Sequence, residues 1–136
     1  MGFSEQRRIE WGDCDEAGVV FYPNYFRWMD GTFHALCAAA GYDQRRLRSE
    51  LGVFGTPLID ARATFRAPAT FGQTFEAAVD VSRWGGTSIT LSYRFVCESV
   101  VLVEGEEARV FVRREHNGRL VKTPVPEPFR NAISAL

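Results

Sequence analysis

The sequence predicts an α+β fold in which a curled antiparallel sheet wraps around one long helix. One stretch near the N-terminus has apolar residues at helical spacing, and most of the chain from residue 57 onward alternates apolar and polar residues with the period of a strand. A sheet with one apolar face must cover that face, and here one helix of suitable length is available. With 136 residues, the chain is expected to form a single domain over residues 1–136.

The long helix is expected to begin at Pro23 and to end before Gly41. Proline suits the first helical turn, where its missing N–H costs nothing, and glycine is common just beyond a helix C-terminus. Between them, apolar residues recur at helical spacing and form one face: Phe26, Met29, Phe33, Leu36, Cys37 and Ala40. A second, shorter helix is expected from about residue 43 to 51, with Gly52 ending it.

The remaining segments are predicted to form an antiparallel meander. Strands are expected at residues 4–11, 57–67, 75–82, 89–95 and 100–114, with a short strand at 120–121 and a helical turn in the tail. In the first strand, Ile9 and Trp11 would share one face. The pair Gly85-Gly86 predicts a two-residue hairpin, and the longest strand is expected to carry a bulge or break near Gly105.

Composition and charge narrow the function classes. The formal net charge is -1 and the pI is near 6.1, whereas a nucleic-acid-binding domain usually carries a basic face, so no nucleic-acid partner is expected. Residues 1–10 lack the apolar core of a signal peptide, and no run is long and apolar enough to span a bilayer, so no membrane association is expected. Three cysteines without paired spacing fit reduced thiols, which predicts a cytoplasmic protein.

The loop between the first strand and the long helix is the most unusual segment. In it Asp15 precedes a helix N-terminus, whose free backbone N–H groups form a weak positive pole. Acyl transfer needs a carboxylate or other base, and also donors for the developing oxyanion. This loop could supply both, and Gly18 would allow close backbone approach. An alternative fits the same pattern: Asp13 and Asp15 are turn residues, and Asn24 helps to cap the helix.

Other chemistries have less support. The two histidines, His34 and His116, are interpreted as structural or surface residues. The consecutive residues Asp13, Cys14 and Asp15 rarely converge on one ion, and no matching Cys/His pair exists elsewhere, so no metal or other cofactor is expected. No serine lies in a Gly-x-Ser-x-Gly context. Cys14 could act as a nucleophile because it flanks Asp15, but a small buried or partly buried thiol is the more common role.

Two segments resemble a known family. Residues Trp11 to Asp30, WGDCDEAGVVFYPNYFRWMD, resemble the signature of the 4-hydroxybenzoyl-CoA thioesterase family, a branch of the hotdog-fold thioesterases. Residues Val53 to Leu58, VFGTPL, resemble the family's approach to its second strand. The order of predicted elements also matches over nearly the whole chain. The resemblance implies a hotdog domain that hydrolyses an acyl-CoA, with an aromatic acyl group similar to 4-hydroxybenzoyl. It also implies a homo-oligomer, a dimer or tetramer, with active sites between subunits.

The resemblance gives roles to individual residues. Asp15 corresponds to the family's catalytic carboxylate, as nucleophile or general base, and the backbone N–H of Tyr22 corresponds to the donor that polarises the thioester carbonyl. Asp30 falls where the family has an acidic residue near the acyl ring, and Thr56 falls close to the catalytic site at the start of a strand. The other residues expected to contact substrate are Gly18, Phe21 and Tyr25.

Two departures from the family pattern concern the loop and the thiol carrier. Glu16 stands where a proline usually follows the catalytic aspartate, which places a second carboxylate beside Asp15. The hairpin at residues 83–88 lacks the basic run that some members use on the nucleotide phosphates, although Arg83 or Arg94 could replace it. An acyl-carrier-protein thioesterase and a non-catalytic acyl-CoA-binding module therefore remain alternatives.

Overall fold

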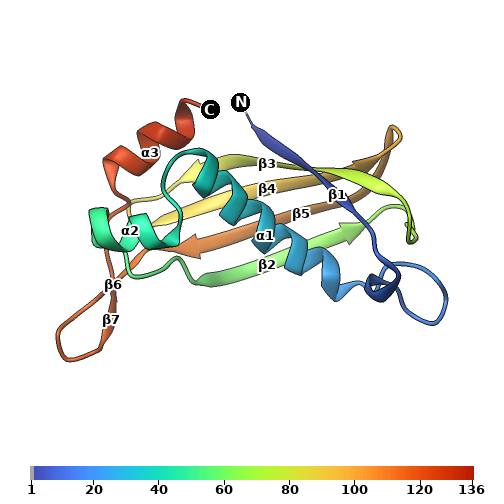
Figure 1. The fold of residues 1–136 in the computed structure, drawn as a ribbon. Coiled ribbons are helices and arrows are strands. Elements are labelled where there is room, and N and C mark those ends of the chain that lie inside the picture. The colour runs from blue at the N-terminus through green and yellow to red at the C-terminus, as the bar shows by residue number, and fades with distance from the viewer. Residues whose placement is uncertain (1) are drawn as a thin grey trace.

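A computed structural model describes residues 2–136 as a five-stranded antiparallel sheet curled around one long helix (Figure 1). The strand order is β1-β3-β4-β5-β2, so β1 and β2 form the edges. The strands are β1 (Phe3–Arg8), β2 (Leu58–Phe65), β3 (Thr74–Trp84), β4 (Ser88–Cys97) and β5 (Val100–Val110), with a separate hairpin of β6 (Val112–Arg114) and β7 (Leu120–Lys122). The helices are α1 (Pro23–Ala39), α2 (Gln44–Leu51), α3 (Glu127–Ser134) and the short 3-10 helix η1 (Trp11–Asp13). The predicted α+β architecture is confirmed.

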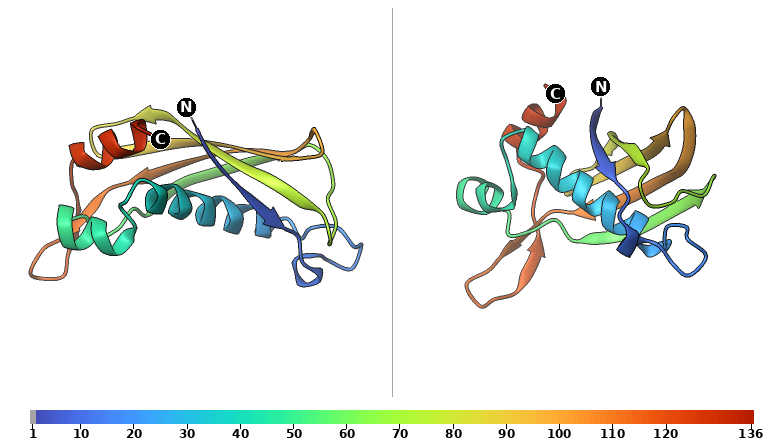
Figure 2. Two further views of the ribbon diagram at one scale, coloured as in Figure 1. Left: turned by 45° about the horizontal axis from the view of Figure 1, so that its top comes forward. Right: turned by 45° about the vertical axis from the view of Figure 1, so that its right-hand side comes forward.

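Helix α1 lies against the concave face of the sheet (Figure 2). Its buried residues share one face: Tyr25, Trp28, Met29, Thr32, Phe33, Leu36 and Cys37. They meet inward-pointing aromatic side chains of the sheet, and the ring centroids of Trp28 and Phe75 are 5.1 Å apart. Phe75 in turn lies 5.1 Å from Phe95. Burial of this apolar surface is the main force that holds helix and sheet together.

Gly105 lies where α1 crosses β5, and not at a break in the strand. It pairs with Ala63 of β2 and with Tyr93 of β4, and neither register shifts there. A Cβ at this position would overlap the side chain of Met29, whose Sδ would be 2.9 Å away. The predicted bulge lies near Gly105 but not at it: the pairing of β5 with β4 shifts register at Leu102, between Val103 and Val101, and the strand is interrupted again at Phe111. Glycine at position 105 admits the helix instead.

Gly105→Ala should lower the free energy of unfolding by about 1–3 kcal/mol, the usual cost of overpacking a core. The added methyl group would force the Met29 side chain out of its present position. Gly55→Ala is the control, because a Cβ at Gly55 would have no neighbouring heavy atom within 4 Å. Urea denaturation measures both variants, and equal stabilities would contradict the packing explanation.

The N-terminal strand is shorter than predicted. It ends at Arg8, and Trp11 lies in η1 with 74% of its surface exposed, whereas Ile9 is buried. The prediction that these two side chains share a strand face is wrong. The reason is local: the Asp13 N–H donates to the Glu10 carbonyl at 3.0 Å, and the Asp13 carboxylate accepts the Glu10 N–H at 2.8 Å. These bonds close a turn that overrides the alternation.

The hairpin between β3 and β4 is longer than predicted. Residues Gly85 to Thr87 connect the strands, and the Gly85 N–H donates to the Ser88 carbonyl at 2.8 Å. The carbonyl of Gly86 accepts the Val125 N–H at 2.9 Å, which ties the segment before α3 to this hairpin.

The end of α2 agrees with prediction, because Gly52 follows it with a φ of 70°. None of the helices within residues 2–136 is long and apolar enough to cross a membrane.

Candidate active site

The loop before α1 folds into a small hairpin with Asp15 at its turn. Cys14 and Val20 form an antiparallel bridge, and the Asp15 N–H donates to the Val19 carbonyl at 2.9 Å. Gly18 closes the turn, because its N–H donates to the Asp15 carbonyl at 2.9 Å. Its φ of 81° lies in the left-handed region that favours glycine. The local sequence thus presents an acidic side chain on a tight, defined turn.

Asp15 is exposed, and one of its carboxylate oxygens is free. Oδ1 accepts the Ala17 N–H at 2.9 Å, a common contact for an aspartate in a turn. Oδ2 has no hydrogen-bond partner among residues 2–136. The neighbouring Glu16 is also exposed and forms no ion pair within the same part of the chain. Asp15 is therefore a turn residue that still has an oxygen available for chemistry.

Asp13 fastens the loop to α1. Its carboxylate pairs with Arg27 at 3.0 Å and accepts the Glu10 N–H at 2.8 Å, so both oxygens are engaged. Its carbonyl accepts the Phe21 N–H at 2.9 Å and the side-chain amide of Asn24 at 2.8 Å. Asn24 therefore ties helix to loop and does not cap α1 with its own oxygen.

In the described chain, residues 2–136, no three His, Cys, Asp or Glu side chains are grouped as a metal site.

The first turn of α1 leaves the backbone N–H of Tyr22 unpaired. Pro23 has no N–H to offer. The Asn24 N–H donates to the Phe21 carbonyl at 2.9 Å, and the Tyr25 N–H donates to the Tyr22 carbonyl at 3.1 Å. The Tyr22 N–H has no acceptor within residues 2–136, and it lies at the positive end of the helix dipole. Such a donor can hold a carbonyl oxygen or an oxyanion.

An apolar pocket of about 290 Å³ lies beside Tyr22. Tyr22, just before α1, and Tyr25 of α1 line it on one side, and Phe65 lines it from the end of β2, while residues 19–20 and 66–69 complete the wall. The Phe65 ring is 6.1 Å from that of Tyr22 and 5.7 Å from that of Tyr25, measured between centroids. Aromatic walls of this kind suit a flat apolar ligand group.

Three predicted site residues relate to this pocket in different ways. Tyr25 lines it but is buried, and burial, with a smaller effect from Cys14, raises the pKa of Tyr25 to about 12. Its hydroxyl therefore stays protonated at neutral pH and cannot serve as a base. Phe21 is half exposed outside the pocket and packs edge-on against Tyr22 at 5.7 Å. Asp15 also lies outside the lining.

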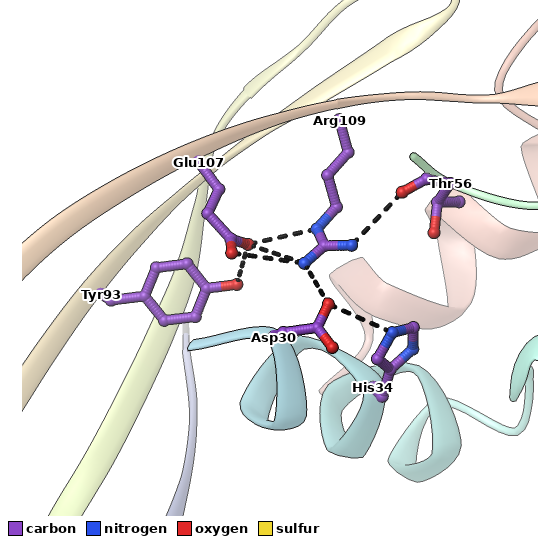
Figure 3. Close-up of polar contacts among 6 residues, drawn as sticks. All are labelled: Asp30, His34, Thr56, Tyr93, Glu107 and Arg109. Carbon is purple, nitrogen blue, oxygen red and sulfur yellow. Dashed lines mark hydrogen bonds and ion pairs between the residues drawn. The ribbon is translucent and has the colours of Figure 1, made fainter. Parts of the chain in front are cut away.

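A polar cluster separate from the loop lies about two helical turns beyond Tyr22 along α1 and includes Asp30 and Thr56 (Figure 3). Arg109 of β5 is its centre and is 3% exposed. Its Nη2 donates to Asp30 Oδ1 at 2.7 Å, and its Nη1 donates to the Thr56 carbonyl at 3.3 Å. Glu107, 2% exposed, accepts from Arg109 Nε at 3.1 Å and from the Tyr93 hydroxyl at 2.6 Å. The structure thus joins two predicted residues here, apart from the loop.

The charges of this cluster stabilise one another. Burial lowers the pKa of Arg109, but the Glu107 charge and the hydrogen bonds that Arg109 donates to Asp30 and Glu107 raise it more, so the net pKa is above its ordinary value. Burial and the Glu107 charge raise the pKa of Tyr93, so its hydroxyl remains a donor. The Asp30 side chain is 55% exposed, and His34 Nε2 lies 3.4 Å from its Oδ1. Asp30 Oδ2 has no partner among residues 2–136.

Glu107, Arg109 and Tyr93 were not predicted as site residues. A signal for the first two is present, because residues 103, 105, 107 and 109 share one face of a strand with period two. The apolar Val103 makes that face a candidate for the inner one, but Leu102 and Val110 do the same for the opposite face, so alternation alone does not place the two opposite charges inside. If they are inside, they are expected to form a hydrogen-bonded ion pair, as buried charges do.

A comparison with known families shows the family to which the chain belongs. Residues 9–133 match the model of the Thioesterase-like superfamily. Because the match extends over most of the chain, the protein belongs to that superfamily. This confirms the resemblance seen in the segment before and within α1.

Named relatives include two enzymes that act on aromatic acyl-CoA thioesters. The 4-hydroxybenzoyl-CoA thioesterase of Pseudomonas sp. (strain CBS-3) is 35% identical over 80 residues, which are 58% of this chain and 57% of that protein. The chain thus aligns with little more than half the length of that relative. The 1,4-dihydroxy-2-naphthoyl-CoA hydrolase of Thermosynechococcus vestitus is 26% identical over 125 residues, 91% of this chain and 83% of that protein.

A solved structure extends the similarity to the whole fold. An aspartate-to-asparagine variant of 4-hydroxybenzoyl-CoA thioesterase in complex with 4-hydroxybenzoyl-CoA superposes with a TM-score of 0.89 at 27% identity, covering 97% of this chain and 98% of that one. The predicted hotdog fold is confirmed. Family, relatives and structure together place the chain among the thioester hydrolases.

Proposed function

We propose that this protein is an acyl-CoA thioesterase that acts on an aromatic acyl group. The observation that carries the proposal is the unpaired Tyr22 N–H beside an apolar pocket, in the same loop and helix start as the carboxylate of Asp15. Thioester hydrolysis needs this combination of an oxyanion donor with a nucleophile or base. An aromatic substrate is supported by the names of the two relatives, which state a 4-hydroxybenzoyl and a 1,4-dihydroxy-2-naphthoyl group as the acyl part of their thioesters.

In the proposed mechanism, the thioester carbonyl oxygen accepts the Tyr22 N–H. Asp15 then acts in one of two ways. It attacks the carbonyl carbon and forms a mixed anhydride that water hydrolyses, or it takes a proton from a water molecule that attacks directly. In both routes the C–S bond breaks, CoA leaves as a thiolate that takes up a proton, and the free acid is released. A thiolate is a good leaving group, so strong acid assistance is not required.

The acyl group is proposed to lie along α1 between Tyr22 and Asp30. Phe26 is four residues from each of them, so the three side chains follow one line on the helix surface. Phe65 flanks this line, with its ring 6.5 Å from that of Phe26. Asp30 lies about 12 Å beyond Tyr22 along the helix axis at 1.5 Å per residue. That span suits an aromatic acyl group with hydrogen bonds at both ends, the far one from a ring hydroxyl to Asp30 Oδ2.

We also propose that a second copy of the chain covers the edge strand β2, giving a homodimer or a tetramer built from it. This edge exposes apolar side chains: 46% of Leu58, 62% of Ile59 and 48% of Phe65. The opposite edge, β1, carries the inward-pointing charges Glu5 and Arg7, a common protection against edge pairing. A partner on β2 would also border the pocket beside Phe65, so substrate would contact two chains.

Sedimentation velocity tests this association, with Ile59→Glu expected to weaken it. A wild-type monomer would contradict it.

A panel of thioesters read by free-thiol release tests the activity. It contains 4-hydroxybenzoyl-CoA, 1,4-dihydroxy-2-naphthoyl-CoA, a straight-chain acyl-CoA, and the same acyl groups on an acyl carrier protein. We expect the aromatic acyl-CoA substrates to be hydrolysed with the highest kcat/KM. Activity confined to carrier-bound substrates would instead define an acyl-carrier-protein thioesterase. Binding without turnover of any thioester would define a non-catalytic acyl-CoA-binding module.

A further inference from the structure

Arg109 connects the buried core of the sheet to the exposed carboxylate of Asp30 (Figure 3). Resting on the proposed function, we infer that Arg109 is a positioning residue that gives the enzyme its preference for acyl groups with a ring hydroxyl. It does so by fixing the Asp30 carboxylate as a charged acceptor at the far end of the acyl site.

The Arg109 guanidinium is held from several sides. Glu107 accepts from its Nε at 3.1 Å and from its Nη2 at 3.3 Å, and the Thr56 carbonyl accepts from its Nη1 at 3.3 Å. Its central carbon lies 4.3 Å from the centre of the Phe33 ring. The Tyr93 hydroxyl fixes Glu107 in turn at 2.6 Å. Because its donors project from a planar, rigid group, the direction of the remaining bond to Asp30 is set as well.

This arrangement commits one Asp30 oxygen and leaves the other open. Oδ1 accepts from Arg109 at 2.7 Å, with His34 also near it at 3.4 Å. Oδ2 has no partner among residues 2–136, and the side chain is 55% exposed. A carboxylate that is already fixed loses little conformational freedom when a ligand binds. Without Arg109, the same side chain would be free to rotate into solvent.

The open oxygen determines which acyl groups are favoured. A carboxylate accepts hydrogen bonds and donates none, so it pairs with a ring hydroxyl. An unsubstituted ring would cover the carboxylate without giving it a partner, and a site that leaves a polar group unpaired discriminates against such a ligand. The buried pair in β5 would thus act on selectivity through Asp30, without touching the reacting thioester.

The experiment compares kcat/KM for 4-hydroxybenzoyl-CoA with that for benzoyl-CoA. The double variant Glu107→Gln/Arg109→Met removes both buried charges together, which avoids stranding one of them. We expect the preference for the hydroxylated substrate to fall by about tenfold or more, the scale of a lost hydrogen bond to a charged group. Adding Asp30→Asn to the double variant should lower the preference no further, because Arg109 acts through Asp30.

A matched control is available on the opposite face of the sheet. Arg62 of β2 pairs with Glu106 of β5, and both side chains are more exposed, at 73% and 38%. The variant Glu106→Gln/Arg62→Met should keep the wild-type preference. Arg109→Lys is a second test of the site, since an ammonium group keeps the charge but cannot reach Glu107, Thr56 and Asp30 together. It should lose part of the preference.

The outcomes separate the inference from the proposed function. A wild-type protein that hydrolyses no acyl-CoA would overturn the proposed function. An active wild type whose preference survives in both Arg109 variants would overturn the inference alone. An equal loss on both substrates would also overturn it, because that result indicates a purely structural role.

Discussion

Asp15→Asn should lower kcat on the preferred acyl-CoA by at least about 100-fold, the usual scale for a missing base. A neutral amide neither attacks the carbonyl carbon nor takes a proton from water. The amide oxygen can still accept the Ala17 N–H, which the Asp15 carboxylate does at 2.9 Å, so the turn should keep its shape and KM should change little. Steady-state thiol release measures both constants. A turnover close to wild type would remove Asp15 from the mechanism.

Glu16 supplies the control for this experiment. It is an adjacent exposed carboxylate with no ion pair within residues 2–136, so Glu16→Gln should keep kcat close to wild type. Glu16→Pro places the family's usual residue after Asp15 and tests the departure in the loop. A large shift in the pH optimum of this variant would show that Glu16 is coupled to Asp15. An unchanged optimum would place Glu16 outside the site.

Arg109→Met should lower the free energy of unfolding by about 3–5 kcal/mol, the typical cost of breaking a buried ion pair from one side. The substitution leaves Glu107, 2% exposed, as a buried charge without its counter-ion. It also removes the donor to the Thr56 carbonyl. Urea denaturation with a linear extrapolation measures the loss.

The double variant Glu107→Gln/Arg109→Met should recover most of that stability, because no lone charge remains in the core. Arg62→Met breaks the exposed pair with Glu106 and should cost no more than about 1 kcal/mol. If the single and double variants at the buried pair lost the same stability, the uncompensated charge would not be the cause.

The long helix was predictable because independent local signals agree on it. Pro23 begins α1, the apolar spacing gives its buried face, and Gly41 follows it with a φ of 86°. Trp11 was not predictable by alternation, because the two bonds between Glu10 and Asp13 form a turn there. Such bonds depend on backbone geometry that a pattern of apolar and polar residues does not contain.

Gly105 shows a second limit of prediction from local sequence patterns. A glycine inside a strand indicates either a bulge or a close approach by another part of the chain. The choice depends on Met29, which is far away in sequence and reaches Gly105 only after α1 packs on the sheet. No local pattern around residue 105 could separate the two explanations.

The candidate site was predictable only in part, because some of its contacts join residues that are far apart in sequence. The loop sequence and its resemblance to a family pointed to Asp15 and Tyr22, but the pattern could not show that Asp13 carries the structural bonds. The link from Asp30 to Arg109 joins residues 79 apart, so it depends on how β5 and α1 come together. Whether Asp15 carries the chemistry stays a prediction for the experiment above.

The unpaired N–H at the start of α1 has a consequence for how such an enzyme can diversify. Under the proposed mechanism, the group that polarises the thioester belongs to the main chain, and every residue type except proline would supply it at position 22. The side chain of Tyr22 is a wall of the pocket. Replacements there can reshape acyl preference while the activating donor is kept, so variant libraries at this position should yield altered substrate ranges more often than dead enzymes.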